Sequence, residues 1–71
     1  MSQLIRNIIA NNVKCLRTSK GLRREELSLL LGYDNSYISK LEKGRVNITV
    51  DKIEQIAKYF DIEPYLLLKN K

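Results

Sequence analysis

The side chains best suited to chemistry gather in one segment, Leu29–Arg45, which reads LLLGYDNSYISKLEKGR. After its internal glycine this segment carries an amide at Asn35, a hydroxyl at Ser36 and an ammonium group at Lys40. An amide both donates and accepts hydrogen bonds, a hydroxyl does the same, and an ammonium group only donates. The chemistry of this segment is therefore recognition by hydrogen bonds, and not the making of covalent bonds.

Catalysis and metal binding lack the residues that they need. The chain has no histidine and one cysteine, Cys15, so it cannot build an ordinary zinc site or an internal disulfide. It also has no glycine-rich phosphate loop and no nucleophile placed beside a base. We expect no enzymatic activity, no metal, no cofactor and no small-molecule ligand, and we expect Cys15 to be a buried small hydrophobe in the middle of a helix.

The charge of the chain is unevenly distributed. Its 71 residues include 13 Lys and Arg against 8 Asp and Glu, a net charge of +5. Residues 6–45 hold nine of the basic and four of the acidic side chains, whereas residues 46–63 hold two and four. A basic excess on so small a body favours a polyanion, with nucleic acid ahead of an anionic membrane. The alternative is a solvated surface with a chance surplus.

These residues must be positioned by helices, because apolar residues recur at helical spacing and no alternating strand pattern competes. We expect one all-α domain over residues 1–71. Thr49 should cap the fourth helix, and Glu63 with Pro64 should open the fifth. The expected helices span about 2–19, 24–31, 35–43, 50–60 and a short stretch from 63. No apolar run has membrane-spanning length and the first residues do not resemble a signal peptide, so we expect a cytoplasmic protein without a membrane partner.

The second and third expected helices satisfy the demands of a helix-turn-helix motif, in which two short helices cross closely at a tight turn. Counting from Arg24, the fifth residue must be small and is Ser28, and the ninth must accept a left-handed turn and is Gly32. Five further positions need apolar anchors, and they are Leu27, Leu31, Tyr33, Ile38 and Leu41. All seven positions are met.

Over about residues 9–67 the chain resembles the Cro/C1-type (XRE) family of bacterial and phage repressors. The resemblance rests on "LR..KGL..EEL", "LG", "SYISKLEKG" and "T.DKIEQIAKYF.I". It implies a five-helix, lambda repressor-like fold and a homodimer that binds a palindromic operator in double-stranded DNA through the major groove, as a transcriptional regulator. Through "SYIS" and the "N-T" loop after the third expected helix, the chain resembles the small controller proteins of restriction-modification systems, and it also resembles compact phage repressors. The resemblance ranks the controller class ahead of the repressors. The alternative is an antitoxin or protein-interaction adaptor that uses the same fold.

The expected roles follow from this geometry and this resemblance. Base readers are Asn35, Ser36 and Lys40, and either bases or phosphates are contacted by Tyr37 and Ser39. Phosphate contacts are Arg24, Lys43, Arg45, Asn47 and Thr49, although Thr49 is equally a helix cap and Lys43 equally a helix C-terminal charge. The resemblance implies a structural pair between Arg17 and Glu42. Apolar residues beyond the needs of a short last helix predict a dimer interface at Ile62, Tyr65, Leu66 and Leu68.

The chain departs from the family pattern in two places. Arg23 and Arg24 stand where relatives carry a capping Ser or Thr followed by Gln, so we expect a lost cap that costs about 1 kcal/mol. Leu29 and Leu30 stand where relatives are often polar. They are either a contact surface or are covered within the monomer.

Overall fold

The computed structural model describes residues 2–70, and these residues form four α-helices and one 3₁₀ turn without any strand. The elements are α1 (Gln3–Ser19), α2 (Arg24–Leu30), α3 (Tyr37–Glu42), α4 (Val50–Tyr59) and η1 (Pro64–Leu67). The all-α prediction is confirmed. The count of five helices is wrong, because the expected fifth helix is the single 3₁₀ turn η1, which begins at Pro64 as its first residue.

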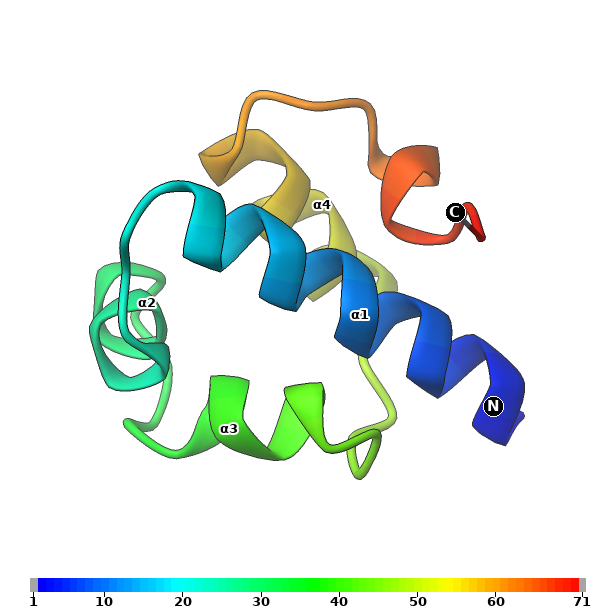
Figure 1. Ribbon diagram of the computed structural model, residues 1–71, viewed down its shortest axis with the longest axis horizontal. Coiled ribbons are helices and arrows are strands. Elements are labelled where there is room, and N and C mark those ends of the chain that lie inside the picture. Colours follow the sequence, from blue (N-terminus) through cyan, green and yellow to red (C-terminus); the bar gives the residue numbers. More distant parts are fainter. Residues whose placement is uncertain (1, 71) are drawn as a thin grey trace.

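The longest helix, α1, runs through the middle of the molecule. Figure 1 shows α3 below it and η1 above it, with α4 packed behind. The Ser2 hydroxyl caps its start by accepting a hydrogen bond from the Ile5 backbone N–H at 3.2 Å. At the other end, Gly21 takes a positive φ of 68° and turns the chain towards α2. This helix therefore serves as the support on which the remaining elements pack.

Every element contributes at least one fully buried apolar side chain to a common core. Val13 of α1, Leu27 of α2, Ile38 of α3, Ile56 of α4 and Leu67 of η1 are all 0% exposed. Burying each large aliphatic side chain contributes roughly 1.5–3 kcal/mol relative to exposure. The core therefore fixes α3 through its buried residues Ile38 and Leu41, and the opposite face of α3 is not covered by the core.

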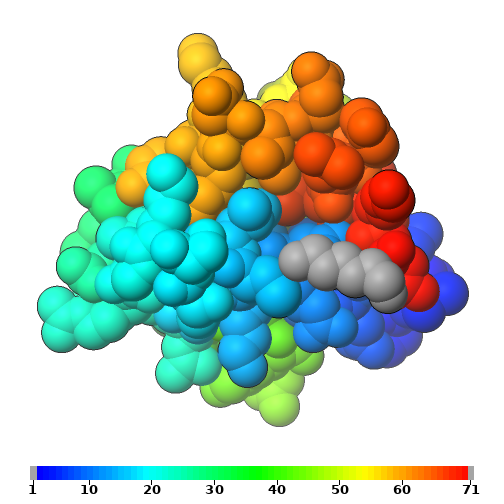
Figure 2. All heavy atoms as spheres, turned by 45° about the horizontal axis from the view of Figure 1, so that its top comes forward, coloured from blue at the N-terminus to red at the C-terminus, as the bar shows by residue number. Residues whose placement is uncertain are grey.

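The C-terminal turn is attached to α1 through one buried amide. Asn12 is 3% exposed, and its Nδ2 lies 2.8 Å from the Leu67 carbonyl, 3.0 Å from the Lys69 carbonyl and 3.3 Å from the Leu66 carbonyl. In Figure 2 the orange and red C-terminal residues rest against the blue half of α1. These bonds supply partners to carbonyls that a short 3₁₀ turn leaves unpaired.

The expectation that Cys15 is buried is wrong, since its side chain is exposed. The buried stripe of α1 passes through Ile9, Asn12 and Val13. Each residue turns an α-helix by about 100°, so a position two residues after Val13 points away from that stripe. The position of Cys15 on the helix, and not its apolar character, therefore determines its exposure.

Among the helices of residues 2–70, none combines the length and the apolar character that crossing a bilayer requires.

Candidate nucleic-acid interface

The chain changes direction between α2 and α3 at Gly32, and Asp34 then forms the hydrogen bonds that precede α3. Gly32 has a φ of +78°, and the next backbone N–H, that of Tyr33, donates to the Ser28 carbonyl at 2.9 Å. Asp34 Oδ1 then accepts hydrogen bonds from the Ser36 backbone N–H at 3.1 Å and from the Ser36 hydroxyl at 3.2 Å. These bonds, the backbone one first, hold the pKa of the Asp34 carboxyl below its ordinary value.

Ser28 connects the two helices through its hydroxyl group. It is 0% exposed, and its Oγ donates to the Arg24 carbonyl at 3.0 Å while accepting from the Ile38 backbone N–H at 3.0 Å. Ile38 lies in the first turn of α3, where backbone N–H groups have no partner inside the helix. The small size of this residue was predicted, but the hydrogen bond that it makes to α3 was not.

The expected base readers are at least partly accessible to solvent, and two of them precede α3. Helix α3 begins at Tyr37, so the prediction that it begins at Asn35 and ends at Lys43 is wrong at both ends. Asn35 and Ser36 belong to the preceding turn, where the Asp34 carboxylate engages the Ser36 N–H. Asn35 and Lys40 are exposed, and Ser36 is half-buried.

Tyr37 does not fit the role of a base or phosphate contact. Its hydroxyl oxygen is buried and has no hydrogen-bond partner among the described residues. Its ring packs edge-on against Tyr33, with centroids 4.8 Å apart, and the Lys52 ammonium lies 4.4 Å from its centre. Burial, with a smaller contribution from Tyr33, raises the pKa of Tyr37 to about 12. Tyr37 therefore anchors the start of α3 to α4, and Ser39, also half-buried, is the remaining member of that predicted pair.

The start of α2 is held in place by a carboxylate. Glu26 Oε1 accepts from the Arg23 backbone N–H at 2.9 Å and from Arg23 Nε at 3.2 Å. An arginine side chain has no acceptor, so only this half of a capping arrangement exists, and the predicted loss of the side-chain cap is correct. Arg24, the first residue of the helix, is exposed. It lines an open pocket of about 710 Å³ together with Arg23, Asn35 and Ser39.

The expected phosphate contacts after α3 lie on one short loop. Lys43, Arg45 and Asn47 are exposed. Thr49 is exposed as well, and its Oγ1 caps α4 by accepting from the Lys52 backbone N–H at 3.2 Å. The capping role considered for Thr49 is therefore present, and its outward position leaves a second role open to it.

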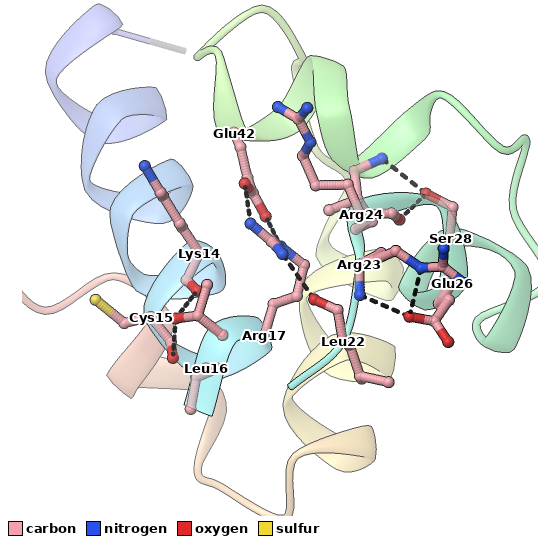
Figure 3. A network of polar contacts seen from close by, with 12 residues as sticks. Lys14, Cys15, Leu16, Arg17, Leu22, Arg23, Arg24, Glu26, Ser28 and Glu42 are labelled. Atoms are coloured by element: carbon pink, nitrogen blue, oxygen red, sulfur yellow. Dashed lines mark hydrogen bonds and ion pairs between the residues drawn. The ribbon is translucent and has the colours of Figure 1, made fainter. Parts of the chain in front are cut away.

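The pair of Arg17 and Glu42 joins α1 to the end of α3 (Figure 3). Arg17 Nε lies 2.6 Å from Glu42 Oε2 and Nη2 lies 3.0 Å from Oε1, so the contact uses both carboxylate oxygens. The remaining amino group donates to the Leu22 carbonyl at 2.7 Å. The two side chains are 12% and 5% exposed, which makes them a largely desolvated, geometrically fixed brace.

Sequence reasoning missed a group of residues on the first two turns of α1. Gln3 Nε2 donates to the Gly44 carbonyl at 3.2 Å, and Arg6 Nε donates to Asn47 Oδ1 at 2.9 Å. These contacts place the first turns of α1 against the loop between α3 and α4. The excess of basic residues in the first part of the chain includes Arg6, but only the tertiary contact shows where it lies.

Two sets of apolar side chains remain outside the core. Leu29 and Leu30 are 61% and 58% exposed, so the alternative that the monomer covers them is wrong. The predicted interface residues form what we call the C-terminal apolar surface: Ile62, Tyr65, Leu66 and Leu68. Its first member is half-buried and the other three are exposed, while Leu67 between them points into the core.

Two short helices locked across a glycine turn, with a polar outer face and basic residues at both flanks, define a helix-turn-helix module. A helix-turn-helix family pattern matches residues 13–67. The chain belongs to this Cro/C1-type (XRE) family, whose members are transcription regulators and not enzymes.

Individual relatives agree with this assignment. A Neisseria hypothetical transcription factor from Neisseria meningitidis serogroup B is 36% identical over 66 residues, which cover 93% of this chain and 62% of the relative. Control protein C.BamHI from Bacillus amyloliquefaciens is 33% identical over 69 residues, which cover 96% of this chain and 85% of the relative. This chain therefore spans less than two thirds of the Neisseria protein's length.

Solved structures show the same arrangement. The crystal structure of the Neisseria transcription factor NHTF superposes with a TM-score of 0.88 at 32% identity, covering 99% of this chain and 82% of that one. The restriction-modification controller protein C.AhdI from Aeromonas hydrophila gives a TM-score of 0.79 at 37% identity, covering 87% and 94%.

Proposed function

We propose that this protein is a sequence-specific, double-stranded DNA-binding regulator of transcription that acts as a homodimer on a palindromic operator. The observation that carries the proposal is the exposed polar side of α3, held by Ser28 at its start and by Arg17 at its end. An α-helix fits the major groove of B-form DNA, and the residues near its N-terminus meet the base edges.

Base reading falls to side chains in the turn before α3 and on α3 itself. The Asn35 amide can pair with the N6 and N7 groups of adenine, and the Lys40 ammonium can donate to O6 or N7 of guanine. Ser36 and Ser39 are both half-buried. Their hydroxyl groups can both donate and accept hydrogen bonds, so they suit contacts with more than one kind of base. A good paired contact discriminates against the wrong base by about 1–3 kcal/mol.

Phosphate contacts position the protein on either side of this reading segment. On the α2 side the candidate is Arg24, whose exposed side chain lies at the start of that helix. On the α4 side the candidates lie on the loop after α3: Lys43, Arg45, Asn47 and Thr49.

The C-terminal apolar surface supplies the proposed contact between two copies. Three of its four large side chains are exposed, and a groove of about 370 Å³ lined by Leu16, Ile62 and Leu66 lies beside them. A two-fold pair would set the two α3 helices about 34 Å apart, one turn of DNA. We place such a dimer in the cytoplasm and propose that it needs no cofactor.

The particular class that we favour is a restriction-modification controller protein, ahead of a compact phage-type repressor. Two of the relatives, C.BamHI and C.AhdI, carry a controller name, and the matches cover 85% and 94% of their lengths. These two relatives support this class.

Selection of bound duplexes from a random pool tests the proposal directly. We expect an enriched palindrome with half-sites about one helical turn apart, and Asn35→Ala should relax the preference at one position of each half-site. Light scattering at tens of micromolar should give a dimer. A monomer that binds all duplexes equally would overturn the proposal and favour the antitoxin or adaptor alternative.

A further inference from the structure

We propose that Arg6, on α1, is an additional DNA-phosphate contact, and that together with Asn47 it forms a clamp just beyond the C-terminal end of α3. This inference rests on the proposed function, since it extends the DNA-binding surface from the helix-turn-helix to the first turns of α1. Figure 1 shows those turns and the loop between α3 and α4 at the same end of the molecule.

The hydrogen bonds of Arg6 fix its position without consuming all of its donors. Arg6 Nε and Nη2 both donate to Asn47 Oδ1, the former at 2.9 Å, and Nη1 donates to Gln3 Oε1 at 3.4 Å. A guanidinium group carries five N–H donors in a rigid planar fork. Two N–H groups therefore remain, one on each terminal nitrogen, and such a fork matches two oxygens of a phosphate.

The charge of Arg6 also remains uncompensated. Its partners are amide groups, which hold the guanidinium without cancelling its charge. Within residues 2–70 the two ion pairs are Arg17 with Glu42 and Arg23 with Glu26, and neither includes Arg6. A positioned cation without an acidic partner is well suited to contact a DNA phosphate.

Asn47 gains an orientation from the same contact. An arginine only donates, so the Asn47 oxygen must face Arg6 and the Asn47 NH₂ group must face away from it. The Asn47 side chain is exposed, so its amide donors stay accessible while its oxygen holds Arg6. Both members of the pair thus keep free donors of the kind that meet phosphate oxygens.

The loop itself is drawn close to α1. Gln3 Nε2 bonds both the Gly44 carbonyl at 3.2 Å and Asn7 Oδ1 at 2.9 Å. A Cβ at Gly44 would lie 2.7 Å from Asn7 Oδ1, so the absence of a side chain there permits this approach. The clamp is therefore held by three side chains of α1 and not by the loop alone.

The test measures the salt dependence of DNA affinity by fluorescence anisotropy, with a duplex that the wild-type protein selects from a random pool. Arg6→Gln should lower the steepness of the log–log salt plot by about 0.9, one phosphate contact. Between 50 and 200 mM salt this is about 3.5-fold less loss of affinity than in wild type. The same change should occur on an unrelated duplex, with the base preference retained.

Two further variants separate a phosphate contact from a structural brace. Arg6→Lys keeps the charge but loses the planar fork, so it should keep the wild-type salt slope while Arg6→Gln does not. Lys58→Gln removes an exposed positive charge from the last turn of α4 and should leave the slope unchanged.

Equal slopes for Arg6→Gln and wild type, or equal behaviour of Arg6→Gln and Arg6→Lys, would overturn the clamp. Either result would leave the proposed function standing, provided that the wild-type protein selects a duplex. If the wild-type protein selects none, the proposed function itself fails, and the clamp fails with it.

Discussion

The two ends of α3 are held by different kinds of interaction. At the N-terminal end, the Ser28 hydroxyl bonds the Ile38 N–H, and these neutral partners lie ten positions apart. At the C-terminal end, Glu42 forms an ion pair with Arg17, 25 positions away on another helix. The start of α3 is therefore set within the helix-turn-helix itself, whereas its direction is set from outside by α1.

Removing the ion pair at the C-terminal end should have the largest effect on stability. Glu42→Ala leaves the Arg17 guanidinium largely buried without its partner, so we expect a loss of about 3–5 kcal/mol in the free energy of unfolding. Urea denaturation followed by circular dichroism measures this loss. The double variant Arg17→Met with Glu42→Leu should recover much of it, because no unpaired charge remains. A loss below 1 kcal/mol for the single variant would show that the brace is unimportant.

Removing the hydroxyl at the N-terminal end should have a smaller effect. Ser28→Ala leaves the buried Ile38 N–H without its partner, so we expect a loss of about 1–3 kcal/mol. Ser19→Ala is the matched control, because the Ser19 hydroxyl bonds the Leu16 carbonyl from an exposed position. Thermal unfolding of both variants compares them directly. If Ser19→Ala were as damaging as Ser28→Ala, the connection between the two helices would not be the cause.

The glycines on either side of α3 differ in the space that each leaves for a side chain. Gly32 and Gly44 have φ values of +78° and +70°, so alanine is strained at both by about 1–2 kcal/mol. A Cβ at Gly32 meets nothing within 4 Å, whereas one at Gly44 meets the Asn7 and Gln3 side chains below 3 Å. We expect Gly44→Ala to be the more destabilising in urea denaturation, and equal losses would contradict the close packing of the loop on α1.

The smallest effect should come from the Asp34 carboxyl and should depend on pH. Hydrogen bonds from Ser36 lower its pKa from an ordinary value of 3.8 in the folded protein. Its contribution to stability is therefore complete above that ordinary value and is lost as the pH falls through the lower folded value. The difference in urea midpoint between wild type and Asp34→Asn should be present at pH 7 and shrink below about pH 4. A difference that stays constant with pH would contradict this role.

Much of the fold could be predicted because the local rules agreed with the packing. Periodicity predicted the end of α1 at Ser19 and placed its start one residue too early, since α1 begins at Gln3. The predicted cap at Thr49 is present, and α4 begins at the next residue. The turn at Gly32 followed from the need for a left-handed residue between two helices. These features depend on neighbours within a few positions.

The features that could not be predicted depend on distant partners. Nothing near Tyr37 in the sequence shows that its hydroxyl is buried beside Tyr33 and Lys52. Nothing near Arg6 indicates a bond to Asn47, 41 positions later. The start of α3 was misplaced because Asp34 engages the Ser36 N–H in a tight turn, which delays the helix to Tyr37.

The amide of Asn12 has a consequence for the order in which the chain folds. Its hydrogen bonds to the Leu66, Leu67 and Lys69 carbonyls each close a loop of more than fifty residues. Contacts at such separation cost more chain entropy and form later than contacts between neighbouring helices. The hydrogen bonds between α2 and α3 span ten positions or fewer, so they can form before the C-terminal turn is attached. Hydrogen exchange should therefore find the backbone near Leu68 opening before that of α3.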